Sequence, residues 1–257
     1  SNKRIKIKKS IINNWRKKLI FLKKKYPVSR ENLKTHKNFI NSFTFIDNLC
    51  KHLKDDDAVV TDMGTSFTCT MQTFEIKNHH KQRLFTSSGL AAMGFGLPGA
   101  IGASFANRDK QIICIVGDGG FMFNIQELQT IKHHDLPIKI FVLENQGYLT
   151  MQLMQKKNFK KLTGSDVKSG VSFPIFKKIA EGFNIEYLKL NNKNIENQLK
   201  KIFSNKKPIL IEVNMPKFQQ LVPRVQAQLL KDGSFSNPEF DNLFPHLPRN
   251  ILEKERH

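Results

Sequence analysis

Two polar residues in this chain could together hold a divalent cation. Asp118 follows the apolar run at residues 112–116, and Asn145 follows the apolar run at residues 138–143. A helix-length segment separates the runs, so we interpret them as neighbouring parallel strands whose carboxyl ends meet at one edge of a sheet. Asp118 and Asn145 should therefore converge. Carboxylate and amide oxygens are hard ligands that suit magnesium or calcium.

Glycines around Asp118 indicate that the cation would accompany an anion. Gly117, Gly119 and Gly120 let the backbone turn tightly and approach a ligand closely. We predict that the helix after Phe121 presents unpaired N–H groups to that anion. A divalent cation with oxygen ligands beside an anion site indicates a metal-bound di- or triphosphate. The alternative is an ordinary strand–turn–helix in which the aspartate only caps the helix.

The sequence Gly-Asp-Gly at residues 117–119, followed by Glu144-Asn145, resembles the signature of thiamine-diphosphate-dependent enzymes. That family usually has two asparagines at the second site. Here Glu144 replaces the first, and Asn145, which matches the metal ligand, is kept. The resemblance implies thiamine diphosphate and Mg²⁺ as cofactors. It also implies three metal ligands, namely Asp118, Asn145 and the backbone carbonyl of Gly147.

Residues 87–100 closely resemble a segment of acetolactate synthases in which a methionine forces the two rings of thiamine into a V. The matching residue is Met93, whose soft thioether fills irregular space well. The resemblance also implies that the backbone carbonyl of Ala91 accepts a hydrogen bond from the cofactor's exocyclic amine. By composition alone, the segment is a turn rich in small residues that enters a tightly packed helix.

A third turn matches the family position that touches the cofactor diphosphate. Acetolactate synthases typically have Gly-Gln-His there, whereas this chain has Thr65-Ser66, whose hydroxyls can still donate to phosphate. We expect the following residues to contact the cofactor: Thr65, Ser66, Ala91, Met93, Gly117, Asp118, Gly119, Gly120, Asn145, Gly147 and Tyr148. A nearby acidic run, Asp55-Asp56-Asp57, is interpreted as the turn before a strand and not as a metal site.

The overall composition excludes some classes of protein. No apolar run approaches the roughly 20 residues of a membrane span. The three cysteines, Cys50, Cys69 and Cys114, are far apart, which indicates reduced, mostly buried thiols in a cytoplasmic protein. The net charge of +20 could indicate a nucleic-acid-binding α/β module. However, lysine outnumbers arginine 34 to 8, and residues 1–30 hold 12 basic and no acidic side chains. We interpret this as compositional bias and expect no nucleic-acid partner.

Strand and helix patterns alternate along the chain. They predict an α/β fold with a doubly wound, mainly parallel sheet and helices on both faces. The resemblance implies that this is the thiamine-diphosphate-binding fold. We divide the chain into a basic lead and linker helix (1–36), a diphosphate-binding domain (37–216) and an irregular C-terminal arm (217–257). An apolar stripe at helical spacing, which includes Trp15, should pack on a neighbour, and Pro27 should end that helix. Periodicity is lost over residues 148–170.

The resemblance implies a 2-oxoacid decarboxylase or carboligase of acetolactate synthase type, which transfers a pyruvate-derived two-carbon unit to a second carbonyl compound. Gln-Leu-Met-Gln at residues 152–155 replaces a Trp-containing segment, so the acceptor stays open. The family glutamate that activates the cofactor lies on a separate pyrimidine-binding domain, and neither Glu127 nor Glu144 can replace it. We therefore expect half an active site, completed by a preceding domain or by a partner subunit of a split 2-oxoacid decarboxylase. When complete, the enzyme should form a homo-oligomer.

Overall fold

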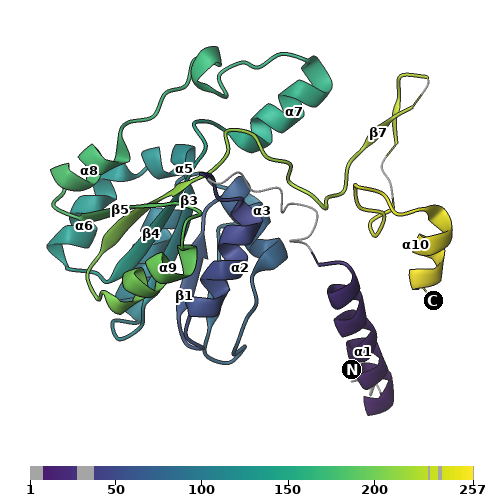
Figure 1. The fold of residues 1–257 in the computed structure, drawn as a ribbon, viewed down its shortest axis with the longest axis horizontal. Helices are drawn as coiled ribbons and strands as arrows, with labels where there is room; N and C mark the ends of the chain where they lie inside the picture. The colour runs from purple at the N-terminus through teal and green to yellow at the C-terminus, as the bar shows by residue number, and fades with distance from the viewer. Residues whose placement is uncertain (1–7, 28–37, 231, 237–238, 257) are drawn as a thin grey trace, which may run out of the picture.

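A six-stranded parallel sheet forms the centre of the molecule (Figure 1). The structure is a computed structural model that describes residues 8–27, 38–230, 232–236 and 239–256. The strand order is β2-β1-β3-β4-β6-β5, and every neighbouring pair is parallel. The strands are β1 (Ala58–Thr61), β2 (Arg83–Phe85), β3 (Ile112–Gly117), β4 (Ile138–Glu144), β5 (Glu186–Leu190) and β6 (Ile209–Asn214). The predicted doubly wound α/β fold is thus confirmed.

Helices cover both faces of this sheet (Figure 1). Those that pack against it are α2 (Ser42–His52), α3 (Thr65–Thr73), α4 (Gly96–Ala106), α5 (Asp118–Met122), α6 (Leu128–His133), α7 (Leu149–Phe159), α8 (Phe176–Gly182) and α9 (Ile195–Ser204). One apolar core joins the sheet to α2, α3, α7 and α9. The other joins it to α4, α5, α6 and α8.

Alternation along the strands explains how one sheet serves two cores. Ile113 and Ile115 of β3 point into the first core, whereas Cys114 and Val116 point into the second. Successive side chains of a strand face opposite sides of a sheet, and here both sides are covered. This is why the predicted strands read as continuous apolar runs. The three cysteines are free and buried, as predicted.

The segment after β4 differs from the prediction. Residues 148–170, expected to be irregular, contain α7 and the short 3-10 helix η4 (Val167–Ser169). The buried positions of α7 are Leu149, Gln152 and Leu153, which do share one face. The periodicity is hard to read because a glutamine occupies that face. Its side chain donates to the Ser165 carbonyl, whereas apolar Met151 is exposed.

A second difference concerns the helix next to Asp118. We expected it after Phe121, but α5 begins at Asp118 itself and is followed by the 3-10 helix η3 (Ile125–Glu127) and α6. The amides of the Gly-Asp-Gly-Gly turn therefore belong to the first turn of a helix. The sequence also failed to reveal β2 and α3, because one is short and the other has no apolar stripe.

Helix α1 (Lys9–Lys25) ends before Pro27, as predicted, yet none of its residues is buried. The apolar stripe is therefore exposed within the described residues, and its packing on a neighbour stays a prediction. Figure 1 shows α1 beside α10 (Arg249–Arg256), and Tyr26 donates to Glu255 across this contact.

The arm expected to be irregular also contains the β7 (Gln228–Leu229) and β8 (Phe235–Ser236) hairpin. Residues 1–7 and 28–36 of the predicted basic lead and linker helix lie outside the described residues. No described helix is long and apolar enough to cross a membrane.

Candidate functional site

Three loops meet at the carboxyl ends of β1, β3 and β4, which are adjacent in the sheet. The chain leaves β1 toward β2 on one side and returns through β3 on the other. Such a reversal of strand order opens a crevice at the sheet edge, where α/β proteins bind their ligands. A cavity of about 250 Å³ occupies this position.

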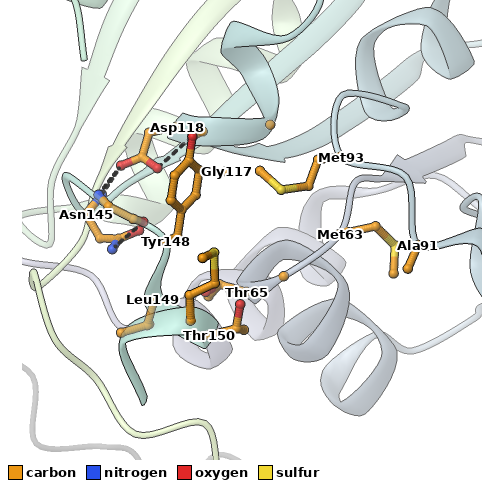
Figure 2. A pocket seen from close by; sticks show the side chains of 15 residues that line it. Met63, Thr65, Ala91, Met93, Gly117, Asp118, Asn145, Tyr148, Leu149 and Thr150 are labelled. Atoms are coloured by element: carbon orange, nitrogen blue, oxygen red, sulfur yellow. Dashed lines mark hydrogen bonds between the residues drawn. The ribbon is translucent and has the colours of Figure 1, made fainter. Parts of the chain in front are cut away.

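Asp118 and Asn145 converge there, as their placement after neighbouring strands predicted. The Asp118 carboxylate accepts hydrogen bonds from the backbone N–H groups of Asn145 and Gly147, both at 3.1 Å. It also accepts from the N–H of Gly119 at 2.7 Å. The Asn145 side-chain amide donates to the Gly147 carbonyl at 3.0 Å. All three predicted metal ligands therefore lie within one hydrogen-bonded group (Figure 2).

The electrostatics of this group fit a bound cation. Asp118 is only 2% exposed, and burial raises its pKa to about 7, since the three backbone N–H bonds offset only part of the desolvation. The nearby charge that acts on this pKa is another carboxylate, Glu144. Within the described part of the chain, no ion pair to Asp118 is present. A buried carboxylate without a cationic partner is costly, and a divalent cation would relieve that cost.

The cavity brings together all but one of the residues expected to contact the cofactor. Ser66 is the exception, because it is buried and its hydroxyl donates to the Met63 carbonyl at 2.9 Å. The predicted residues that line the cavity are Thr65, Ala91, Met93, Gly117, Asp118, Gly119, Gly120, Asn145, Gly147 and Tyr148. Sequence reasoning missed Met63, Gly64, Leu149, Thr150 and Met151, which also line it.

Tyr148 packs directly against the glycine-rich turn. A Cβ on Gly119 would collide with the Tyr148 ring, so only glycine fits at that position in this arrangement. Figure 2 shows Asp118, Asn145 and Tyr148 at one side of the cavity. The opposite side holds Met63, Ala91 and Met93. The cavity therefore has a polar end that could hold a charged group and an end lined by methionines.

The turn with Met93 leaves its apolar side chains accessible. Met93 is 39% exposed and Leu90 is 88% exposed. Ala91 adopts a left-handed backbone conformation with φ of 51°, which is uncommon for a residue other than glycine. Apolar groups exposed together beside a cavity mark a surface suited to a ligand or a further protein segment.

Glu144 does not line this cavity, although it precedes Asn145. It faces a neighbouring cavity with Tyr187, Lys189 and Glu212. The buried Glu212 carboxylate accepts from the Tyr187 hydroxyl at 2.7 Å and pairs with Lys189. The replacement of the family's first asparagine by Glu144 thus falls outside the polar end of the first cavity.

The acidic run at residues 55–57 forms a turn before β1, as predicted. Asp57 is buried and accepts from the backbone N–H of Lys54. The described residues contain no cluster of three or more His, Cys, Asp or Glu side chains that could hold a metal. The Asp118 group, with one carboxylate, one amide and one carbonyl, is of a different kind.

Comparison with known proteins identifies the family. Residues 62–213 match the model described as thiamine pyrophosphate enzyme, C-terminal TPP binding domain, where TPP is thiamine diphosphate. The chain belongs to this family. The matched region begins at the end of β1 and ends in β6, so it contains every residue that lines the cavity.

Relatives with assigned names point to one branch of the family. The acetolactate synthase large subunit of Lactococcus lactis is 31% identical over 90% of this chain and 40% of its own length. The chloroplastic acetolactate synthase 1 of Zea mays is 32% identical over 83% of this chain and 34% of its own length. The large subunit of acetolactate synthase isozyme 1 of Escherichia coli is 35% identical over 66% of this chain and 30% of its own length. The chain is thus acetolactate synthase-like and spans well under half the length of these relatives.

Proposed function

We propose that this chain is the diphosphate-binding part of a thiamine-diphosphate- and Mg²⁺-dependent 2-oxoacid decarboxylase or carboligase of acetolactate synthase type. The convergence of Asp118, Asn145 and the Gly147 carbonyl at one end of the cavity is the observation that supports this proposal most directly. Bound there, Mg²⁺ would neutralise both the buried carboxylate and the diphosphate. The family match and the acetolactate synthase relatives support the choice of cofactor.

The chain's own residues then have separate tasks. Asp118 and Asn145 would hold the cation, and the Gly120 amide, in the first turn of α5, would face the diphosphate, because the Gly119 amide is already bonded to Asp118. The Thr65 hydroxyl would donate to a phosphate oxygen. When bound, thiamine diphosphate supplies the nucleophilic carbon that attacks the 2-oxoacid and stabilises the charge left by decarboxylation.

The opposite end of the cavity would position the organic part of the cofactor. Met93 would support the V shape of the two rings, and the Ala91 carbonyl would accept a hydrogen bond from the exocyclic amine. Because Met93 and Leu90 are exposed in this chain, we propose that a pyrimidine-binding domain covers them. That domain would contain the activating glutamate and could lie elsewhere in the protein or on another subunit of a homo-oligomer.

The substrates follow from the reaction class. A 2-oxoacid such as pyruvate would be decarboxylated, and its two-carbon unit would pass to a second carbonyl compound. In α7, the cavity is lined by Leu149, Thr150 and Met151, whereas Gln152 and Leu153 are buried and do not line it. Thr150 and Met151 are exposed and are therefore the residues of this helix that we expect to approach the acceptor.

Calorimetric titration tests the cofactor assignment. We expect thiamine diphosphate and inorganic pyrophosphate to bind in the presence of Mg²⁺, and thiamine without its diphosphate to bind at least about tenfold more weakly. Asp118→Ala should abolish the effect of Mg²⁺, because it removes the anionic ligand. Equal affinity of the variant and the wild-type protein for thiamine diphosphate would refute the assignment.

A second assay tests the need for another domain. Pyruvate consumption by the purified chain, with excess thiamine diphosphate and Mg²⁺, should be absent. Robust turnover would mean that a proton-relay acid lies within this chain. Activity that appears only after a separate pyrimidine-binding protein is added would favour a split 2-oxoacid decarboxylase.

A further inference from the structure

Asp62 is a second buried carboxylate at the same edge of the sheet, and the proposed function does not use it. It follows β1 and is only 1% exposed. No ion pair to Asp62 is present in the described residues. Burial raises its pKa, and backbone N–H groups of Met63, Gly94, Phe95 and Gly96 oppose that rise. Because burying a carboxylate is costly, we expect its hydrogen bonds to serve a structural or functional purpose.

The bonds made by Asp62 lead to the turn that contains Met93. Both carboxylate oxygens accept from the Gly94 N–H, at 3.1 and 2.9 Å, and one also accepts from the Met63 N–H at 2.7 Å. Helix α4 begins at Gly96 and has no side-chain cap of its own. Asp62 therefore caps this helix from another part of the chain, where its negative charge also complements the helix dipole.

Asn124 holds the same peptide segment from the other side. Its side-chain amide donates to the Gly94 carbonyl at 2.8 Å. Gly94 has φ of 89°, and a Cβ there would lie 2.6 Å from the Cβ of Phe123. Glycine is thus required by both conformation and space. We call Asp62 and Asn124 together the Gly94 clamp.

The clamp connects the two ends of the cavity. Met93 immediately precedes Gly94, so the position of its backbone depends on both bonds of the clamp. We call the Gly-Asp-Gly-Gly turn at residues 117–120 the diphosphate turn. A Cβ on Gly120, in this turn, would collide with Oδ2 of Asp62. One carboxylate therefore touches the turn expected to face the diphosphate and fixes the turn expected to support the thiamine rings.

We propose that Asp62, aided by Asn124, is a positioning residue that fixes the position of Met93 relative to the diphosphate turn. Asp62 does not line the cavity, and it acts through Gly94 and Gly120. The benefit to cofactor geometry rests on the proposed function, whereas the effect of the clamp on Met93 is a property of the free chain. A rigid support of this kind is what a precise cofactor geometry requires.

The test compares Asp62→Asn with Asp57→Asn. Both aspartates are 1% exposed and flank β1, but Asp57 lies at the opposite end of the strand and accepts from Lys54. In Asp62→Asn, we expect hydrogen exchange of the Gly94 amide to accelerate about tenfold, because the charge-assisted bond is lost. The Met93 methyl resonance, assigned with Met93→Leu, should shift or broaden in methionine-labelled protein. Asp57→Asn should leave both signals unchanged.

Ligand binding adds the functional readout. In Asp62→Asn, affinity for Mg²⁺ with inorganic pyrophosphate should stay within about twofold of wild type, whereas the preference for thiamine diphosphate over pyrophosphate should shrink. Asn124→Ala releases the clamp from its more exposed side and should reproduce the exchange and methyl changes. It serves as the test if Asp62→Asn does not fold.

Two results have different meanings. If Asp62→Asn and Asn124→Ala both keep wild-type exchange and an unchanged Met93 methyl signal, the positioning role is wrong. If the wild-type chain binds neither pyrophosphate nor thiamine diphosphate with Mg²⁺, the proposed function fails. In that case the exchange and methyl measurements still test the clamp, since they need no ligand.

Discussion

Asp62 and Asp118 occupy equivalent places at the ends of neighbouring parallel strands, yet they face different partners. Both carboxylates are almost fully buried, and burial raises the pKa of each. The Asp62 carboxylate accepts hydrogen bonds from main-chain N–H groups and thereby holds a turn in place. Asp118 also accepts main-chain bonds, but it lines the cavity. We infer that access to the cavity, and not burial or strand position, distinguishes the roles proposed for these two carboxylates.

The largest expected difference is a pH effect on stability without metal. Asp118 has an ordinary pKa of 3.8 when unfolded and about 7 when folded. The stabilisation of the folded state by protonated Asp118 is therefore fully present below about pH 4 and is lost as pH rises through 7. This loss lowers the free energy of unfolding by on the order of 4 kcal/mol. Asp118→Asn should lack this loss. Urea unfolding from pH 4 to 8 with a chelator measures this loss. If the free energy of unfolding depends on pH in the same way for both proteins, the raised pKa of Asp118 is refuted. Adding Mg²⁺ should reduce the wild-type loss.

The second difference concerns the dependence of cofactor binding on metal. Asp118→Asn should lower the affinity for thiamine diphosphate with Mg²⁺ about 100-fold, because a neutral amide replaces the anionic ligand. Asp62→Asn should retain the full ratio between affinities measured with and without Mg²⁺. Calorimetry on both variants gives the ratio directly. If the two variants lose the ratio equally, the distinction between the two carboxylates collapses.

Two adjacent glycines provide a third comparison. Gly120→Ala should destabilise the chain by about 2 to 3 kcal/mol, because its Cβ would collide with the Asp62 carboxylate, which is fixed by its hydrogen bonds to the Gly94 and Met63 N–H groups. Gly119→Ala should cost less, about 1 kcal/mol, because the collision is with the Tyr148 ring, which can turn aside. Urea unfolding ranks the two. The reverse order would show that Asp62 is less firmly held than its hydrogen bonds indicate.

The smallest effect is expected at the residue beside Asn145. Glu144→Asn restores the pair of asparagines typical of the family, but the side chain faces the neighbouring cavity with Lys189 and Glu212. Affinity for thiamine diphosphate with Mg²⁺ should change by no more than about threefold. A larger change in the titration would indicate that the charge of Glu144, which raises the pKa of Asp118, also affects cofactor binding.

The sequence revealed those parts of the site that depend on local pattern. Asp118 and Asn145 could be predicted because each follows an apolar strand, and parallel strands bring their ends together. The role of Asp62 could not, because its main partner, Gly94, lies 32 residues further along the chain. Met151 was missed because Gln152 occupies a buried position of α7 and interrupts the apolar pattern by which this helix could have been recognised. Contacts that depend on three-dimensional packing leave little trace in residue order.

Helix α1 has a practical consequence for measurement. Trp15, the single tryptophan among these 257 residues, is 59% exposed on that helix and does not line the cavity. Intrinsic tryptophan emission therefore reports on solvent around α1 and is blind to events beside Asp118. A cofactor titration that leaves this emission unchanged is not a negative result. A shift of the emission to shorter wavelength would instead signal that another surface has covered the helix.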